Sequence, residues 1–499
     1  MKRSSGVLMH ISSLPNDYGI GTMGQSAYEF VDFLVETGQS YWQILPLTTT
    51  SYGDSPYQSF SAFAGNTNLI DLEQLIAQNL LEKSDLEGFD FEQSIDKVDY
   101  HKTETNRRPL LEKAVEKFLE LKGNKTDEFK VFVEGNAQWL QPFSAFMTVK
   151  EHFDSKPLYE WPDAYRLYDA NLIENHCKSN QTHMDYYIVT QYFFFTQWHT
   201  LKDYANKHQI EIIGDIPIYV SRDSVEMWQQ PELFLVDENK QPIAVAGVPP
   251  GPLSDKGQHW GNPVYDWPAL KETNYQWWMQ RFKESFHLYD WVRIDHFRGF
   301  ESYWVIPLEE EDARAGSFKK GPGIDFFDQA RKEFGELQII AEDLGFITEE
   351  VIELREKTGF PGMNILQYGF NGFEDNEYLP HHYVSNSVAY VGTHDNPTGR
   401  EWYEQEASHE VQEQVDRYLN RRPNEPISHA LNRGVAASTS QMVIYTMQDL
   451  LGLGEEARMN IPSTVGGNWD WRMKPDAITD EVKDKLLQLT QTYFRMNDK

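Results

Sequence analysis

The sequence predicts an α/β fold, a (β/α)8 TIM barrel with large, mainly helical insertions. Short apolar runs that end in polar residues, glycine or proline recur along the chain. Helix-like segments separate most of these runs, a pattern typical of βα units and a parallel sheet. Eight such runs are present, the number of strands in this barrel, and a chain of 499 residues can hold one barrel with insertions.

The candidate strands are unevenly spaced along the chain. They cover residues 7–12, 42–46, 211–216, 291–295, 337–342, 363–367, 388–393 and 442–447. The second and third runs lie roughly 160 residues apart, although one crossover helix requires only a dozen or so. We therefore expect one catalytic barrel over 1–499, with an inserted, mainly helical subdomain at 48–210.

Within the first insertion, residues 107–122 and 127–136 have charged faces and spaced apolar positions, and 184–207 is aromatic-rich. These patterns predict three helices, the last of them long. A second insertion, at 221–274, is rich in proline, glycine and tryptophan, and we expect it to form ordered loops.

Charge and cysteine content argue against several classes of function. The chain has 45 Lys+Arg and 77 Asp+Glu, a formal net charge of −32, which repels phosphate backbones and anionic lipids. We expect no nucleic-acid and no membrane partner, whereas a neutral sugar is unaffected by this field. Cys177 is the single cysteine, so an intramolecular disulfide cannot form. The N-terminal apolar run is too short for a signal peptide, and we expect a cytoplasmic protein.

Acidic residues stand at the ends of four candidate strands. Asp215, Asp295, Glu342 and Asp395 each follow a run of β-forming residues, and the C-terminal ends of barrel strands face the active site. One acid at a strand end is more often a helix cap, but four at one barrel mouth favour catalysis. Glycosyl transfer uses such a set, with one carboxylate attacking the anomeric carbon and a protonated carboxyl protonating the leaving oxygen.

Metal binding is the competing use of clustered acids. Carboxylates can hold Mg²⁺ or Mn²⁺, but the sequence lacks phosphate-cradling glycine loops and spaced histidine ligands. A neutral sugar also needs no metal to bind. We favour glycosyl transfer and expect no cofactor.

Motifs spread over nearly the whole chain carry a family resemblance. They are DSPYQ at 54–58, FAGN at 63–66, GDIPIYV at 214–220, GQHWGNP at 257–263, RIDHFRG at 293–299, AEDLG at 341–345, GFPGM at 359–363, GTHDN at 392–396, QD at 448–449, RMNIP at 458–462 and NWDWR at 468–472. This set resembles the amylomaltases, the disproportionating 4-α-glucanotransferases of glycoside hydrolase family 77 in the α-amylase clan. The resemblance implies a barrel without a separate C-terminal β domain.

The resemblance also assigns catalytic roles. Asp295 would be the nucleophile of a retaining double displacement, and Glu342 the general acid and then the general base. Asp395 would bind sugar hydroxyls at the cleavage point. The implied substrate-binding residues are Tyr57, Asp215, Gln258, Trp260, Arg293, His394 and Asn468.

The implied reaction moves segments of α-1,4-glucans, such as maltodextrins, starch or glycogen, to the 4-hydroxyl of an acceptor. Trp260 would form part of the acceptor subsite, since flat rings suit the apolar faces of pyranoses. No metal is implied, because residues 215–220 lack the asparagine that often helps to hold Ca²⁺ in the clan.

Two segments depart from the family pattern. Family members usually carry Asp-Tyr-Phe after Gly-Val-Pro-Pro, whereas this chain has Gly251-Pro252-Leu253, and Ser463 stands where glycine is usual. An aromatic lid over the acceptor groove is thus partly missing. A hydrolase of the same clan therefore remains an alternative, as does a non-catalytic glucan-binding protein. The intact set of catalytic acids argues against the latter.

Overall fold

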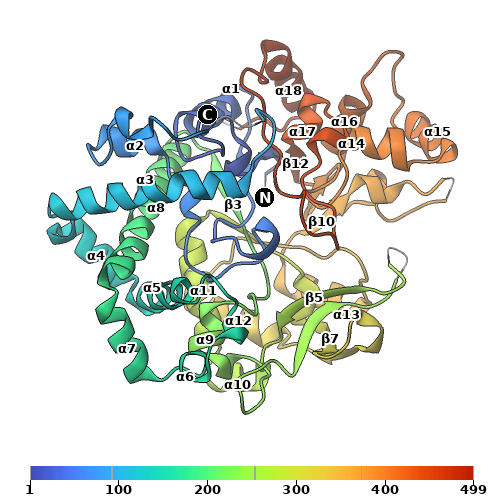
Figure 1. Ribbon diagram of the computed structural model, residues 1–499. Coiled ribbons are helices and arrows are strands. Elements are labelled where there is room, and N and C mark those ends of the chain that lie inside the picture. Colours follow the sequence, from blue (N-terminus) through green and yellow to red (C-terminus); the bar gives the residue numbers. More distant parts are fainter. Residues whose placement is uncertain (1, 92–93, 252–253, 373, 498–499) are drawn as a thin grey trace.

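Eight parallel strands form the barrel in a computed structural model that describes residues 2–91, 94–251, 254–372 and 374–497 (Figure 1). The strands are β1 (Ser4–Leu8), β2 (Tyr41–Gln43), β3 (Glu211–Ile216), β6 (Trp291–Ile294), β9 (Ile339–Ala341), β10 (Gly362–Ile365), β11 (Ser387–Tyr390) and β12 (Met442–Thr446). Their order is β10-β11-β12-β1-β2-β3-β6-β9, and every neighbouring pair is parallel. The amide of Ala341 donates to the carbonyl of Pro361 at 2.9 Å, which links β9 to the residue preceding β10. The predicted (β/α)8 barrel is confirmed.

Burial on both faces explains why these strands read as continuous apolar runs. All residues of β11 and β12 are buried, as expected for a parallel sheet covered by helices. The predicted strand positions are confirmed, with one clear difference at the start of the chain. The first strand begins at Ser4 rather than residue 7, because Ser5 is buried and its hydroxyl donates to the Gln39 side chain at 2.7 Å.

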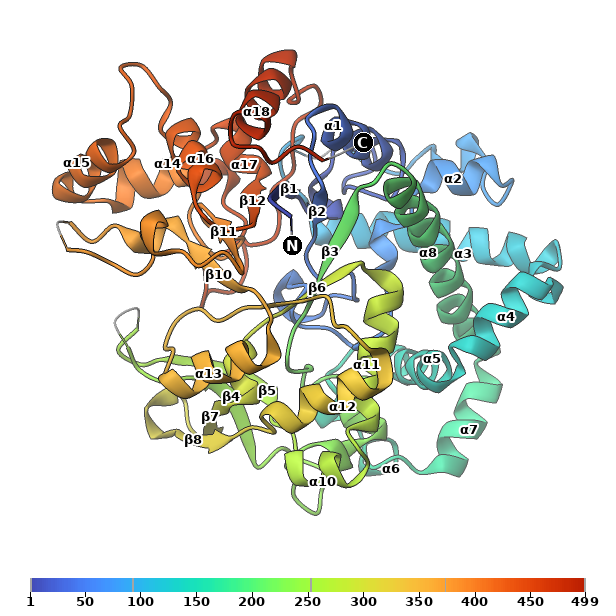
Figure 2. The ribbon, with the colours of Figure 1, turned by 180° about the vertical axis from the view of Figure 1, so that it is seen from behind.

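Helices surround the barrel (Figure 2). They are α1 (Gln25–Glu36), α2 (Leu72–Ala77), α3 (Tyr100–Glu120), α4 (Asp127–Gly135), α5 (Ala137–His152), α6 (Asp163–Arg166), α7 (Ala170–Ser179), α8 (Gln181–Lys207), α9 (Val225–Gln229), α10 (Trp267–Glu272), α11 (Gln276–Leu288), α12 (Ile324–Phe334), α13 (Glu349–Thr358), α14 (Gly399–Glu401), α15 (His409–Tyr418), α16 (Ile427–Ala437), α17 (Met447–Leu451) and α18 (Asp480–Thr492). After β12, the described chain continues through α17 and α18. Among the described residues, no helix combines the length and apolar character needed to cross a membrane.

Helices α2 to α8 occupy the long connection between β2 and β3. The three helices predicted there are present as α3, α4 and α8, although α3 begins seven residues before the predicted start. Two glutamines of α8 hold the chain that precedes α2. The side chain of Gln191 pairs with both backbone groups of Gly65, at 2.7 and 2.9 Å, and Gln197 does the same with Asp71, at 2.7 and 3.1 Å. These contacts fix the base of the loop that carries Tyr57.

A second, four-stranded antiparallel sheet lies beside the barrel. It contains β4 (Ala244–Val248), β5 (Gln258–Pro263), β7 (Ser302–Pro307) and β8 (Ser317–Lys320), in the order β5-β4-β7-β8. Only ordered loops are predicted at 221–274, from the proline, glycine and tryptophan content. The strands β4 and β5 are not predicted because Gly247 and Gly261 interrupt the alternation that marks a strand. The register also shifts between Val245 and Gly247. Of the departing segment, Pro252 and Leu253 lie outside the described residues.

Candidate active site

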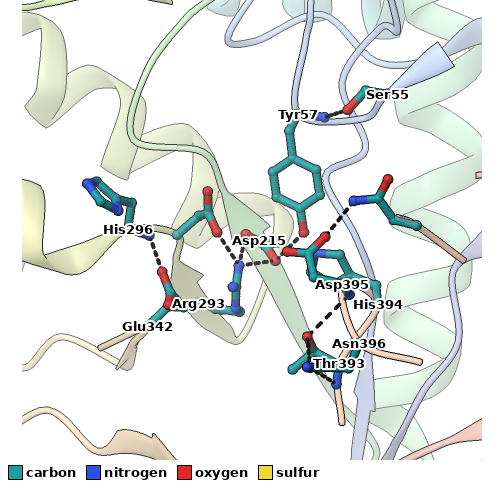
Figure 3. Close-up of polar contacts among 12 residues, drawn as sticks. Ser55, Tyr57, Asp215, Arg293, His296, Glu342, Thr393, His394, Asp395 and Asn396 are labelled. Carbon is teal, nitrogen blue, oxygen red and sulfur yellow. Dashed lines mark hydrogen bonds and ion pairs between the residues drawn. The ribbon is translucent and has the colours of Figure 1, made fainter. Parts of the chain in front are cut away.

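The ends of four barrel strands carry the four predicted acids. Three of them, Asp215, Glu342 and Asp395, are labelled in Figure 3. Asp215 is in β3, Asp295 directly follows β6, Glu342 directly follows β9, and Asp395 lies in the loop after β11. The amide of Asp295 donates to the Ile216 carbonyl at 3.0 Å. The barrel ladder thus fixes these side chains next to one another.

Arg293 joins two of the acids. Its Nη1 donates to both oxygens of Asp215, at 3.0 and 2.8 Å, and to Oδ1 of Asp295 at 3.0 Å. Residues 293 and 295 lie two apart, so their side chains leave the same face of the strand. Burial raises the pKa of Asp215 to about 6, although the charge of Arg293 opposes this rise. Burial also raises the pKa of Asp295, again against the opposing charge of Arg293.

Exposure increases from the floor of the site to its mouth. The side chain of Asp215 is 0% exposed, that of Asp295 is 27% exposed and that of Asp395 is 44% exposed. A ligand can therefore touch Asp295 and Asp395 directly. Asp215 instead acts on the site through its contacts with Arg293 and Tyr57.

Tyr57 reaches the barrel from the loop that precedes α2. Its hydroxyl donates to Oδ2 of Asp215 at 2.9 Å, and its ring stacks on His394 with the centroids 5.1 Å apart and an angle of 18°. Trp469 packs against both rings, with centroid distances of 5.7 and 5.9 Å. This aromatic cluster forms one wall of the site.

Two backbone amides hold the Glu342 carboxyl group. His296 donates to Oε2 at 2.6 Å, and Leu344 donates to Oε1 at 3.1 Å. Burial nevertheless raises the pKa of Glu342 to about 8, helped by the negative charge of Asp295 and opposed by Arg293. Glu342 is therefore protonated at neutral pH, which is the state that a general acid requires.

The turn after Asp295 positions this donor. His296 has φ 55° and ψ 49°, in the left-handed region, a conformation that is uncommon for a residue other than glycine. This turn directs the His296 amide to Glu342 and places the ring edge-on against Trp260, with the centroids 4.8 Å apart. The ends of β6 and β9 and the Trp260 ring thus meet at His296.

Asp395 is held in its charged form. Asn460 donates to Oδ1 at 2.6 Å, and His394 Nε2 lies 3.4 Å from Oδ2. Burial alone would raise the pKa of Asp395, but the charge of His394 and the hydrogen bonds from His394 and Asn460 lower it below its ordinary value. The same pairing raises the pKa of His394 in spite of its burial.

The remaining predicted residues lie on neighbouring segments. Gln258 and Trp260 are on β5, and the indole N–H donates to the Gln258 side chain at 2.9 Å. Asn468 accepts from the Ile461 amide at 3.0 Å and donates to the Thr464 hydroxyl at 3.0 Å. Asn468 therefore closes the 461–468 loop, which begins next to Asn460.

Several residues that support the acid cluster were not predicted from the sequence. Asn460 lies inside the RMNIP motif, yet nothing in its local pattern indicates that it supports Asp395. Asn396 donates to the Tyr368 hydroxyl at 3.0 Å and so places that ring near the acids. Tyr368 follows the sixth strand of the barrel in chain order, and its position after a strand end was the available signal.

Three comparisons with known proteins match nearly the whole chain. The family model described as 4-alpha-glucanotransferase, Glyco_hydro_77, matches residues 9–479. A 4-alpha-glucanotransferase from Streptococcus pneumoniae is 55% identical over 498 residues, covering 100% of this chain and 98% of that protein. One from Clostridium butyricum is 47% identical, covering 98% of this chain and 100% of that protein. The solved amylomaltase from Streptococcus agalactiae in complex with acarbose has a TM-score of 0.96 at 47% identity, covering 99% of this chain and 100% of that one.

Proposed function

The chain belongs to the 4-α-glucanotransferases of glycoside hydrolase family 77, and from this premise we propose a residue-level mechanism in which Asp295 is the nucleophile. Asp295 is partly exposed and holds one hydrogen bond from Arg293 at 3.0 Å. Its attack on the anomeric carbon would form a glucosyl ester and break the glycosidic bond. The electron pair of that bond goes to the leaving oxygen.

Glu342 supplies the proton in the first step and recovers it in the second. A pKa of about 8 keeps the carboxyl group protonated when the donor binds, so the leaving 4-oxygen departs as a hydroxyl group. The resulting carboxylate then takes the proton from the 4-hydroxyl of the acceptor, which attacks the ester. The observation that carries this assignment is the geometry of two neighbouring strand ends. Asp295 accepts a hydrogen bond from Arg293 at 3.0 Å, and the Glu342 carboxyl group is held by the His296 and Leu344 amides.

Asp395, with a lowered pKa, is a hydrogen-bond acceptor for sugar hydroxyls at the cleavage point. His394 lies beside it, and the Tyr57 ring stacks on His394. We assign the aromatic wall to the sugar that is transferred and Trp260 with Gln258 to the acceptor. Arg293 and Asp215 are positioning residues, because neither has more than 3% of its side chain exposed.

The substrates proposed are maltooligosaccharides and longer α-1,4-glucans of the maltodextrin, starch or glycogen type. The high identity to named 4-alpha-glucanotransferases supports this class. The chain is proposed to act in the cytoplasm, since its single cysteine suits a reducing compartment. We also propose that residues 48–210 and 221–274 are insertions in one catalytic barrel.

Product analysis from pure maltotriose tests this proposal. Transfer yields glucose together with chains longer than the donor, whereas hydrolysis yields only shorter products. We expect Asp295→Asn to abolish both product types while the fold is retained. The matched control is Asp328→Asn, an exposed acid on α12 that lies 3.9 Å from Arg331. Normal transfer by Asp295→Asn would refute the nucleophile assignment, and a product set without longer chains would favour the hydrolase.

A further inference from the structure

Three potential metal ligands converge in the connection between β10 and β11, outside the acid cluster. Asp375, His381 and His382 are exposed, and their ligand atoms lie within 4.8 Å of one another. The two histidines are adjacent in the short helix η11 (Pro380–His382). This connection lies beside α15 in both ribbon views (Figures 1 and 2).

The two imidazoles point at the same carboxylate oxygen. His381 Nε2 lies 3.1 Å from Oδ1 of Asp375, and His382 Nε2 lies 2.8 Å from that atom. Ligand atoms that each bind one ion at about 2.0–2.2 Å are separated by about 3–3.5 Å. The three donors therefore lie close to the positions that one ion would require, and small side-chain shifts would admit it.

The other ring nitrogen of His381 already has a partner. Its Nδ1 lies 2.9 Å from the Tyr418 hydroxyl at the end of α15. Metal-binding histidines usually have such a partner on the second nitrogen, which fixes the ring orientation and the tautomer. His381 is thus oriented from α15 with Nε2 towards Asp375.

There is also space beside two of the three donors. Asp375 and His382 line a surface cavity of about 350 Å³, together with Glu377 and Arg355. Solvent in this cavity can supply the remaining ligands of an ion. Two imidazoles and one carboxylate form a donor set that suits Zn²⁺ and its neighbours better than Mg²⁺ or Ca²⁺.

We propose that Asp375, His381 and His382 form a binding site for one divalent transition-metal ion, with Zn²⁺ as the preferred ion. The site is separate from the catalytic acids and is not required for their chemistry. An ion there joins Asp375 to η11 and so fixes the connection between β10 and β11. The side chain of Asn376, next to Asp375, donates to the Tyr368 carbonyl at 3.0 Å. An ion bound to Asp375 therefore also restrains the backbone of Tyr368.

Calorimetric titration of the EDTA-treated, dialysed full chain with Zn²⁺ tests this site. We expect one Zn²⁺ per chain, and an affinity at least about 10-fold weaker in His382→Ala and in Asp375→Ala. The matched control is His409→Ala, because His409 is 80% exposed and lies 3.6 Å from Glu413 on the same helix. This exposed histidine–acid pair should leave the titration unchanged.

Two further measurements guard against misfolded variants and scattered surface binding. Saturating Zn²⁺ should raise the Tm of the unaltered chain by about 1–3 °C and leave the Tm of His382→Ala unchanged. In the absence of metal, the unaltered chain and His382→Ala should have the same Tm. Co²⁺ should give visible absorption bands that disappear in His382→Ala. Zn²⁺ uptake that is absent, or that is equal in the unaltered chain and all three variants, would overturn the proposal.

Discussion

Arg293 pairs with both Asp215 and Asp295, whereas burial raises the pKa of the nearby Glu342 carboxyl group to about 8. This difference explains how neighbouring acids can have different roles. A carboxyl group whose pKa is raised by burial donates a proton at pH 7, while a charge-paired neighbour remains a nucleophile. In the proposed mechanism, Glu342 is therefore the proton donor and Asp295 the nucleophile.

The pH dependence of activity follows from Glu342. Its pKa of about 8 means that the general acid is protonated below pH 8 and deprotonated above it. We expect kcat/KM for maltotriose to fall about tenfold per pH unit above that value. An α-maltosyl fluoride donor needs no proton on its leaving group, so its first step should lack this alkaline limb. The same limb with both donors would contradict the role of Glu342.

Asn460 provides a second test at the scale of single residues. Its 2.6 Å hydrogen bond helps to keep Asp395 charged and oriented. Loss of a hydrogen bond to a charged group costs about 1.5–3 kcal/mol, so Asn460→Ala should lower kcat/KM by roughly 10- to 100-fold. Asn386→Ala, which removes an exposed hydrogen bond to the Gly359 carbonyl, serves as the control in the same steady-state assay. Equal kcat/KM values for the two variants would contradict a role for Asn460 in supporting Asp395.

At the scale of elements, the strand ends and the small sheet supply different parts of the site. The barrel strands carry the acids, whereas β5 carries Trp260 and Gln258. β5 pairs with β4, and the segment that departs from the family pattern falls between these two strands in the sequence. The four acids are carried by other elements, the barrel strands.

Trp260 should govern the choice of acceptor more than bond cleavage. We expect Trp260→Ala to reduce transfer to added glucose about tenfold, because an aromatic contact with the acceptor is lost, and to increase the share of hydrolysis. Trp304→Ala, on β7 of the same sheet, is the matched control. Chromatography of products from maltotriose with and without glucose gives both ratios. An unchanged ratio in Trp260→Ala would place the acceptor elsewhere.

Some of the strands could be predicted from the sequence, and others could not. Parallel strands buried on both faces produce continuous apolar runs, so β3 and β12 are predicted almost to the residue. The β4–β5 hairpin is not predicted, because Gly247 and Gly261 break its alternation. Acids at strand ends could be found from topology alone, whereas Asn460 could not, because its contact with Asp395 joins residues 65 positions apart.

At the scale of the whole molecule, the net charge of −32 and the neutral substrate predict weak salt dependence. Screening changes the encounter of charged partners, but a maltooligosaccharide has no charge to steer. We expect kcat/KM for maltotriose to change less than about twofold between 20 and 300 mM NaCl. A steep decrease would indicate an electrostatic contribution to binding that the described site does not contain.

The long helical connection between β2 and β3 joins distant parts of the molecule. It separates β2 from β3 in the chain but brings Tyr57 back to Asp215, at 2.9 Å. Sequence spacing predicts the insertion, and the DSPYQ motif contains Tyr57, which contacts Asp215. The closure of that loop by Gln191 of α8 depends on tertiary packing and carries no local signal.

Mass spectrometry of a trapped intermediate can detect the proposed covalent glucosyl ester on Asp295. The Glu342→Gln variant with 4′-deoxy-α-maltosyl fluoride should form the ester without an acid and release it slowly without a base. We predict a gain of one 4′-deoxymaltosyl unit on the peptide that contains Asp295, and no gain when Asp295→Asn is added. A label on another residue, or fluoride release that is unchanged by Asp295→Asn, would contradict the account.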